Sequence, residues 1–223
     1  MRQRHKNRET IPVINTRKRV FCNGEILEVP FELRTEKVYW AFPMDEILFS
    51  LWFRNFLQLD IMPWDDTGIT MNTYLPMARN YLHKRFLESD ANWMVMLDSD
   101  VLPPADFLKK LMAHNLPIVG GWYKKKGGNS EPVVYDYVEE SGKDGYYWWR
   151  IRKKPGRGLE KVDGAGAGCW LLQKKVAEAI GEQPYEMEKG GEDMDFCMKI
   201  KKAGFDIHID WDIACAHAGV AFV

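Results

Sequence analysis

The sequence lacks the features that mark a membrane-spanning, secreted or disulfide-stapled chain. Among its 223 residues no apolar run approaches the ~18 to 20 that a spanning helix needs, and the basic start leads into no apolar signal-peptide stretch. Its 4 cysteines are scattered without a CxxC pair or a zinc-like cluster, which favours reduced, buried thiols. We therefore expect a cytoplasmic protein without a transmembrane segment.

The signatures of several nucleotide-binding folds are also missing. No GxxxxGK[ST] phosphate loop occurs, and the glycines at 164, 166 and 168 alternate too loosely for a dinucleotide fingerprint. Residues 38–46 contain no glycine, which argues against the glycine-rich N-terminal phosphate loop of a nucleotidyltransferase. The length, with 46% hydrophobic and 28% charged residues, fits one globular domain with a substantial core.

Positive charge is concentrated at the N-terminus. Residues 1–20 carry seven basic side chains and one acid, so a segment of +6 precedes a remainder of −7. Such a segment can hold a polyanion such as nucleic acid by counterion release, although solvated basic tails are common. We expect a basic N-terminal arm over residues 1–36 and a compact domain over residues 37–223.

Apolar patterning alternates strands with helices in the first half of that domain. The expected strands are 38–42, ended by Pro43, then 93–97 and 117–121; the expected helices are 45–59, 75–87 and 105–113, with a loop at 63–68. This alternation predicts a mainly parallel sheet covered by helices, with ligands at the carboxyl ends of its strands. In the second half we expect a hairpin over 133–152 and a glycine-rich strand entry at 163–172. Helices at 174–180 and 192–203 and short final strands are expected to follow.

Two acids follow the apolar run 93–97. Asp98 and Asp100 are one residue apart, so in extended geometry their carboxylates leave the same side of the backbone and can grip one hard cation. Mg²⁺ or Mn²⁺ prefers few protein oxygens plus substrate phosphates, which suits a nucleotide diphosphate. Two further Asp-x-Asp matches begin at Asp193 and Asp210, so the tripeptide alone is uninformative; only Asp98-Ser99-Asp100 follows a clean apolar run and precedes a Pro-Pro helix start.

A second acidic cluster opens the helix expected from residue 192. Glu192, Asp193 and Asp195 follow two glycines there. Carboxylates at a helix start are stabilised by free amides and the helix dipole, so capping is the structural alternative. Three acids in four residues exceed what capping requires, and a carboxylate fixed at such a place suits a general base.

Three further features are candidates for ligand contacts. His217 ends the last expected strand, where a neutral imidazole could complete the coordination of Mn²⁺, although a lone histidine is usually structural. Arg79 and Asn80 lie on the helix before the Asp98 strand, where a guanidinium suits phosphate or a pyrimidine edge and a surface ion pair is the equally simple alternative. The alternating glycines of 164–168 permit close approach to a ligand or sharp bends.

In this order the motifs resemble the GT-A glycosyltransferases, particularly the family-2-like type of bacteria and bacteriophages. The resemblance runs from about Val38 to Gly219. Its landmarks are a strand with Pro43, Ala-Arg-Asn at 78–80, the Asp-x-Asp strand at 96–101, Val-Gly-Gly with an aromatic and basic tail at 119–124, the glycine-rich segment 163–172, Gly-Glu-Asp-x-Asp-Phe-Cys at 191–197 and a terminal histidine. It implies an α/β, Rossmann-like GT-A fold with a mixed, mainly parallel sheet flanked by helices and a small β-rich region on the acceptor side.

The resemblance also implies a function and a set of site residues. A nucleoside-diphosphate sugar, with a UDP-sugar as the leading donor, would bind with Mn²⁺ or Mg²⁺ over the first half of the domain. The implied metal ligands are Asp98, Asp100 and His217, and the implied donor contacts are Pro43, Arg79, Asn80, Asp98, Ser99, Gly121 and Gly166. Asp193 would deprotonate the acceptor hydroxyl for inverting transfer, and Glu192 would orient the acceptor or donor sugar.

The acceptor is left open between a saccharide and other hydroxyl compounds. Residues 146–157 hold two Tyr, two Trp and five Arg or Lys, which could stack on sugars or bind nucleobases and phosphates; a packed hairpin with a solvated rim is the alternative. One rival is a phage-type enzyme in the host cytoplasm that glycosylates nucleic acid bases, contacting the polymer through residues 1–20 and 146–157. Another is a non-catalytic sugar- or nucleotide-binding module on the same fold, against which the intact acidic clusters argue.

Overall fold

The computed structural model describes residues 16–22, 25–31, 34–44, 50–127, 131–140, 145 and 147–219, in two compact units, 1–35 and 36–223. In the first unit β1 (Thr16–Cys22) pairs antiparallel with β2 (Glu25–Phe31), in a register that joins Thr16 to Phe31. The sequence pattern predicts no such hairpin in the basic arm. Residues 1–15 lie outside the described parts, so the nucleic-acid contact expected for residues 1–20 stays a prediction.

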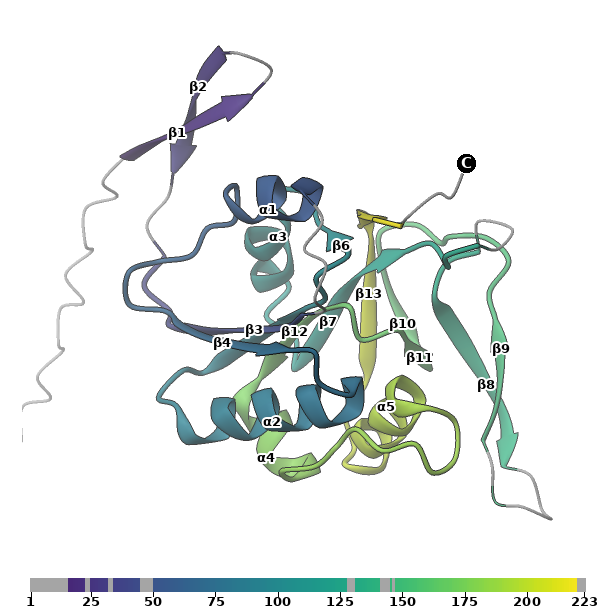
Figure 1. The fold of residues 1–223 in the computed structure, drawn as a ribbon. Helices are drawn as coiled ribbons and strands as arrows, with labels where there is room; N and C mark the ends of the chain where they lie inside the picture. The colour runs from purple at the N-terminus through teal and green to yellow at the C-terminus, as the bar shows by residue number, and fades with distance from the viewer. Residues whose placement is uncertain are drawn as a thin grey trace, which may run out of the picture. The chain divides into compact units, whose positions relative to one another are not determined.

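The second unit is built on a mixed eight-stranded sheet (Figure 1). Its strands are β3 (Val38–Met44), β4 (Asp66–Met71), β5 (Trp93–Leu97), β6 (Val101–Leu102), β7 (Ile118–Tyr123), β10 (Leu159–Val162), β12 (Cys169–Gln173) and β13 (Ile207–His217). They follow the order β10-β13-β7-β12-β5-β3-β4, and β6 pairs with β13. β3 is parallel to β4 and β5, and β7 is parallel to β13, whereas β12 is antiparallel to both its neighbours.

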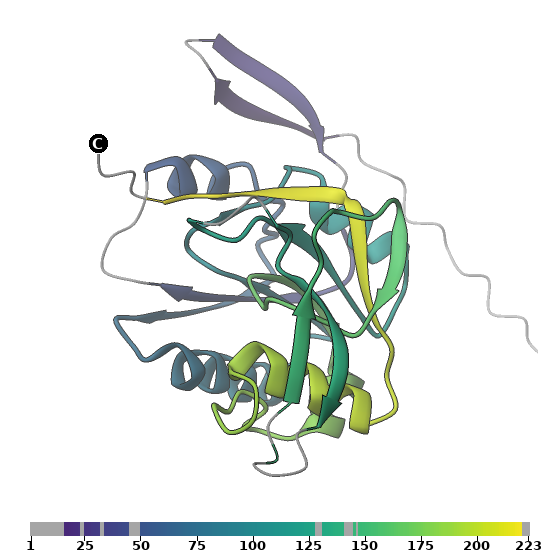
Figure 2. The same cartoon turned by 90° about the vertical axis from the view of Figure 1, so that its right-hand side faces the viewer.

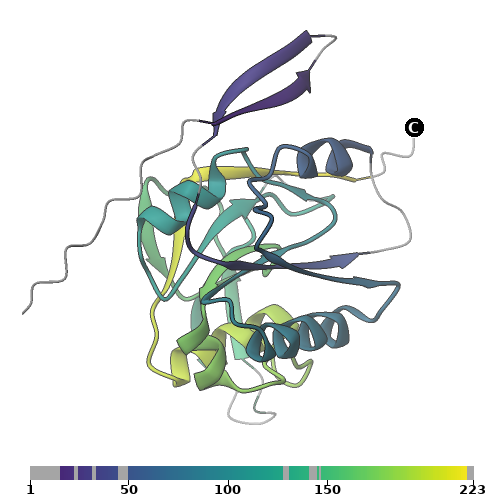
Figure 3. The same cartoon turned by 90° about the vertical axis from the view of Figure 1, so that its left-hand side faces the viewer.

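Helices cover both faces of this sheet (Figures 1 and 3). α1 (Ser50–Phe56) and α3 (Phe107–Ala113) lie on one face, and α2 (Leu75–Glu88), α4 (Lys174–Ile180) and α5 (Glu192–Lys202) lie on the other. β3 shows why the central strands are apolar throughout: Trp40 and Phe42 enter the core shared with α1 and α3, while Tyr39 and Ala41 enter the core shared with α2 and α5. Among the described helices, none is long and apolar enough to span a membrane.

A small second sheet stands beside the main one (Figure 2). β8 (Val134–Glu140) pairs antiparallel with β9 (Tyr147–Ile151) and with the short β11 (Gly164–Ala165). The predicted hairpin over 133–152 is therefore present, and most of its expected turn, 141–144, lies outside the described residues. The mixed sheet, the flanking helices and this β-rich addition confirm the α/β fold class.

Several element boundaries predicted from the sequence are wrong. Pro43 does not end β3, which continues to Met44 and pairs with β4. β4 occupies part of the predicted loop 63–68, whose Pro, Asp and Gly content suggests a turn. Gly68 instead allows β4 to pack against β3, because a Cβ at this position would lie 2.0 Å from the Tyr39 hydroxyl. The last strands are one strand of 11 residues, β13.

The helices show smaller differences. α3 begins at Phe107 rather than at residue 105, and α1 covers only Ser50–Phe56 of the predicted helix 45–59, of which residues 45–49 lie outside the described parts. α2 and α4 match their predicted ranges to within one residue. The apolar face of a helix is encoded locally, so these elements are the most predictable from sequence.

Candidate active site

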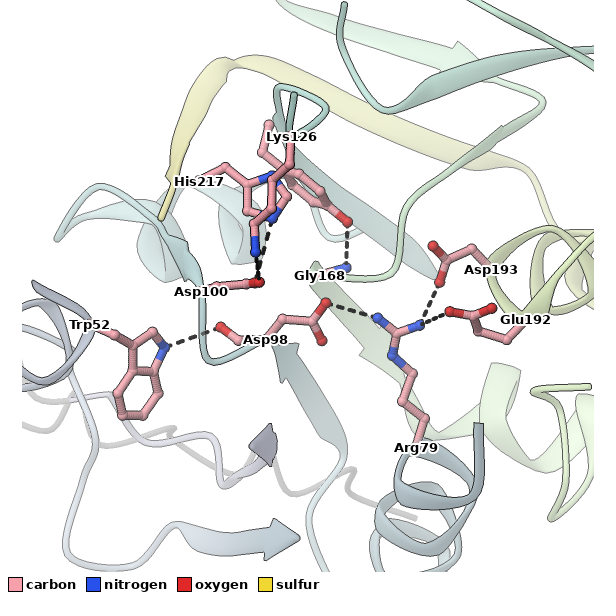
Figure 4. Close-up of polar contacts among 10 residues, drawn as sticks. Trp52, Arg79, Asp98, Asp100, Lys126, Gly168, Glu192, Asp193 and His217 are labelled. Atoms are coloured by element: carbon pink, nitrogen blue, oxygen red, sulfur yellow. Dashed lines mark hydrogen bonds and ion pairs between the residues drawn. The ribbon is translucent and has the colours of Figure 1, made fainter. Parts of the chain in front are cut away.

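A buried arginine joins the two acidic clusters (Figure 4). Arg79, on the second turn of α2, is 1% exposed. Its Nη2 donates to Oδ2 of Asp98 at 2.8 Å, and its Nη1 donates to Oδ1 of Asp193 at 2.6 Å and lies 3.4 Å from Oε1 of Glu192. One guanidinium therefore connects the end of β5 to the first turn of α5.

The three carboxylates around this guanidinium leave an excess of negative charge. Burial raises the pKa of Asp98 to about 6, although the charge of Arg79 opposes the shift. Burial and the neighbouring Asp193 also raise the pKa of Glu192. Oδ1 of Asp98 is buried and has no hydrogen-bond partner. Both the charge balance and this unsatisfied oxygen suit a further cation at the site.

Asp100 faces away from Arg79 and toward the end of β13 (Figure 4). Its Oδ2 pairs with the ammonium of Lys126, and its Oδ1 lies 3.6 Å from Nε2 of His217. Burial alone would raise the pKa of Asp100, but His217 and Lys126 outweigh it and lower that pKa. Asp98 and Asp100 thus meet different partners despite their spacing.

The imidazole of His217 is held in one orientation. Its Nδ1 lies 2.7 Å from the carbonyl oxygen of Lys124, and because a carbonyl only accepts, Nδ1 carries the proton. The buried ring of Tyr123 stands edge-on to the imidazole, with ring centroids 4.9 Å apart. Nε2 is thereby turned toward Asp100, which is how metal-binding histidines are commonly fixed.

The predicted metal ligands lie near one another but do not converge. Within the described ranges, no three Asp, Glu, His or Cys side chains form a metal-binding group, because Asp98 turns toward Arg79 while Asp100 and His217 face each other. The donor set still fits a divalent cation: the unpartnered oxygen of Asp98, the Asp100 carboxylate and Nε2 of His217 are the mixed oxygen and imidazole ligands that suit Mn²⁺. The metal assignment stays a prediction.

The glycine-rich segment packs directly against the Asp98 strand end. The Asp98 amide donates to the Gly168 carbonyl at 3.1 Å, and the Gly168 amide donates to the Tyr123 hydroxyl at 3.0 Å. A Cβ on Gly166 would lie 2.3 Å from that hydroxyl, and one on Gly168 would lie 3.0 Å from Oδ2 of Asp98. The glycines are therefore needed for close approach, and Gly168 lies nearer to Asp98 than the sequence alone could indicate.

Sequence reasoning also missed three other residues at this site. Tyr123 supports both Gly168 and His217, and Lys126 pairs with Asp100. Trp52 of α1 donates its indole N–H to the Asp98 carbonyl at 3.1 Å. The basic tail after Val-Gly-Gly is a signal that could have drawn attention to Lys126, whereas nothing in the local pattern identifies Trp52.

Two predicted donor contacts have structural explanations. The side-chain amide of Asn80 binds both the carbonyl and the amide of Tyr185, at 2.7 and 2.9 Å, and so fixes the loop before α5. A Cβ on Gly121 would lie 2.8 Å from the Ile213 side chain, so this glycine lets β7 approach β13. Pro43 lies near the carboxyl end of β3, and Ser99 is buried between the two site acids.

Asp195 and Asp210, two of the remaining acids of the Asp-x-Asp matches, serve the fold, whereas Asp212 is exposed. Asp195 is buried, and its Oδ2 accepts the backbone amides of Glu188 and Lys189 at 2.8 and 3.2 Å, so it holds the loop that precedes the helix. Asp210 pairs with His114 at 2.8 Å. Of the second cluster, only Glu192 and Asp193 reach Arg79.

The aromatic and basic segment 146–157 combines a few packed side chains with an exposed basic rim of Arg150, Lys153, Lys154 and Arg157. Tyr147 is buried, and its ring lies edge-on to Tyr137. Arg152 pairs with both Asp136 and Glu160, as a packed hairpin would require. Trp148, in contrast, is 60% exposed and is available to a partner. Tyr146 lies outside the described residues.

Comparison with known proteins places the fold. No family model matches the chain, and no curated protein matches it. Among solved structures, the viral protein A197 from STIV is similar with a TM-score of 0.58 and 21% identity, over 82% of this chain and 86% of that one. GalNAc-T7, solved with UDP, GalNAc and Mn²⁺, is similar with a TM-score of 0.59 and 11% identity, over 83% of this chain. The fold is GT-A.

This GT-A likeness is one of fold alone at such identities. The matched region spans 43% of the GalNAc-T7 chain, so most of that protein has no counterpart here. Within the GT-A fold of this chain, the Asp98 motif follows β5, and the acids that meet Arg79 open α5. The chemistry of the site has to be argued from these side chains.

Proposed function

We propose that this chain is a glycosyltransferase that moves a sugar from a nucleoside-diphosphate sugar to a hydroxyl of a saccharide or another acceptor. A UDP-sugar is the leading candidate for the donor. The observation that carries this proposal is the buried guanidinium of Arg79, which binds Asp98 of the strand-end motif and Asp193 of α5 within a GT-A fold. Three carboxylates around one buried guanidinium contribute little to folding stability, because the cost of removing the charges from water offsets their attraction. Such clusters are typical of functional sites.

The proposed cation site consists of Asp98, Asp100 and His217. A bound Mn²⁺ or Mg²⁺ would neutralise the charge that develops on the departing nucleoside diphosphate. The remaining proposed donor contacts are Pro43, Asn80, Asp98, Ser99, Gly121 and Gly166. Arg79 is reassigned from donor contact to positioning residue, because its guanidinium is buried among protein carboxylates.

Asp193 is the proposed general base. Its side chain is 26% exposed while that of Arg79 is 2% exposed, so an acceptor can reach the carboxylate but not the guanidinium. The acceptor hydroxyl gives its proton to Asp193 while its oxygen attacks the anomeric carbon. The bond from that carbon to the diphosphate oxygen breaks, and the nucleoside diphosphate leaves with the electron pair. Attack opposite the leaving group inverts the anomeric centre, with Glu192 orienting a sugar.

The test separates donor binding from transfer. A thermal-shift screen of nucleotide sugars with and without Mn²⁺ identifies the donor, and release of nucleoside diphosphate rather than pyrophosphate identifies the reaction. With that donor, Asp193→Asn should lower the transfer rate by about 10² to 10⁴-fold and leave Mn²⁺-dependent donor binding intact. Asp106→Asn, at an exposed residue just before α3, is the matched control.

Two results would contradict the proposal. If no nucleotide sugar stabilises the protein in the presence of Mn²⁺, the glycosyltransferase assignment is wrong. If Asp193→Asn abolishes donor binding together with transfer, Asp193 belongs to the donor site and is not the base.

A further inference from the structure

Three consecutive lysines line a hollow beside Asp100 and His217. The hollow has a volume of about 760 Å³ and is bounded mainly by Trp122, residues 124–127 and the 214–217 end of β13. The lining residues include Lys124, Lys125 and Lys126, all with exposed side chains, and among those that the structure describes none is acidic. The hollow is therefore positively charged and suits an anion.

The backbone of this lysine segment is tied to its surroundings. Lys124 forms a β-bridge with Pro132, and the Lys125 amide donates to the Glu131 carbonyl at 2.9 Å. The Lys124 carbonyl also accepts a hydrogen bond from Nδ1 of His217. Because the same residue anchors both the segment and the imidazole, the lysine charges stand at a defined place next to the proposed cation site.

Lys126 links the hollow to that cation site. Its ammonium pairs with Oδ2 of Asp100, the carboxylate whose other oxygen faces His217 (Figure 4). The side chain of Lys126 is 45% exposed and that of Asp100 is 23% exposed, so the pair lies where solutes can reach it. A divalent cation bound to Asp100 would repel the ammonium and compete with it for the same oxygens.

We propose that the hollow binds the phosphates of a nucleoside diphosphate and that Lys126 couples this binding to the cation site. The choice of a nucleoside diphosphate as the ligand rests on the proposed glycosyltransferase function. In the free protein the Lys126 ammonium neutralises Asp100. When a divalent cation takes Asp100, the ammonium is displaced, and its three N–H donors turn to phosphate oxygens in the hollow, where Lys124 and Lys125 add positive charge. Lys126 is thus a positioning residue that favours binding of cation and phosphates together.

The test uses Mn²⁺ and pyrophosphate as probes on the full chain. For Lys126→Met we expect Mn²⁺ alone to bind roughly threefold more tightly, since a competing cation is removed, as measured by the electron paramagnetic resonance of free Mn²⁺. In the presence of saturating Mn²⁺, we expect pyrophosphate to bind this variant about tenfold more weakly by calorimetry. Lys110→Met on α3, a lysine that also has one carboxylate partner, is the matched control and should change neither affinity.

Each outcome decides the inference separately from the proposed function. Unchanged or weaker Mn²⁺ binding by Lys126→Met overturns the competition, and unchanged pyrophosphate binding overturns the phosphate site. If the wild type transfers sugar but either of these negative results is found, the proposed function holds and the phosphate site is wrong. If pyrophosphate binding depends on Lys126 but the protein turns over no nucleotide sugar, the phosphate site holds and the proposed function is wrong. Lys126→Gln, with unfolding temperatures for both variants, separates these effects from misfolding.

Discussion

Replacing the buried arginine tests whether the two acidic clusters depend on one shared cation. Arg79→Met keeps an unbranched side chain of helix-forming type but removes the guanidinium that contacts Asp98 and Asp193 at 2.8 and 2.6 Å. The variant leaves these carboxylates and Glu192 facing one another without their common partner. We expect it to be clearly less stable than the wild type.

The size of the loss follows from burial. Breaking a buried ion pair by removing one partner costs about 3–5 kcal/mol. The Arg79 side chain is 2% exposed, but the side chains of Asp98 and Asp193 are 17% and 26% exposed and regain some hydration. We therefore expect a loss of about 3 kcal/mol, at the lower end of that range. In a domain of this size such a loss lowers the unfolding temperature by roughly 6–12 °C.

The pH dependence gives the prediction its sign. The folded-state pKa of Asp98 is already raised to about 6, and without Arg79 it should rise further. A carboxyl with a raised folded-state pKa binds its proton more readily in the folded than in the unfolded chain. Protonation of Asp98 as pH falls should therefore stabilise the folded variant more than the folded wild type. The stability deficit of Arg79→Met should therefore be smaller at pH 5 than at pH 7.5.

The assay is thermal or urea unfolding of both proteins at the two pH values. Lys84→Met, on the exposed side of the same helix where Lys84 meets Glu182 in a surface pair, is the control and should show no measurable change. A deficit below about 1 kcal/mol at pH 7.5, or one that does not shrink at pH 5, would refute the reasoning, because the carboxylates would then not need Arg79.

Two further predictions concern buried groups on and near α2. Burial lowers the pKa of His83 to about 4, so between pH 6.5 and pH 4 the unfolded chain takes up a proton that the folded chain excludes. This one group should cost the folded state about 3 kcal/mol over that range, and urea unfolding should show the cost as a difference in pH dependence between the wild type and His83→Gln. In Gly168→Ala a Cβ would lie 2.8 Å from the Tyr123 hydroxyl and 3.0 Å from Oδ2 of Asp98. We therefore expect urea unfolding to show a free energy of unfolding lower by about 1–3 kcal/mol, together with weaker Mn²⁺ binding. Wild-type values for both would show that the glycine-rich segment can move aside.

Local patterns in the sequence were sufficient for the elements that carry the site. The run Trp93–Leu97 is a strand with the predicted ends, and α2 and α4 follow their apolar patterns closely, because the period of buried side chains is encoded residue by residue. The position of Asp98 after a buried strand and of Glu192 at a helix start followed from the same patterns. The sequence thus determined the α/β class and where acids meet the ends of elements.

Only the tertiary structure decided which of these side chains meet. Arg79 comes from α2, Asp98 from the end of β5 and Asp193 from α5, and a guanidinium is buried only if partners from distant segments reach it. The spacing of Asp98 and Asp100 predicted one shared ligand, but their different neighbours turn one toward Arg79 and the other toward Lys126. Long-range contacts set these directions, because the local sequence restricts the backbone yet leaves open what each side chain will face.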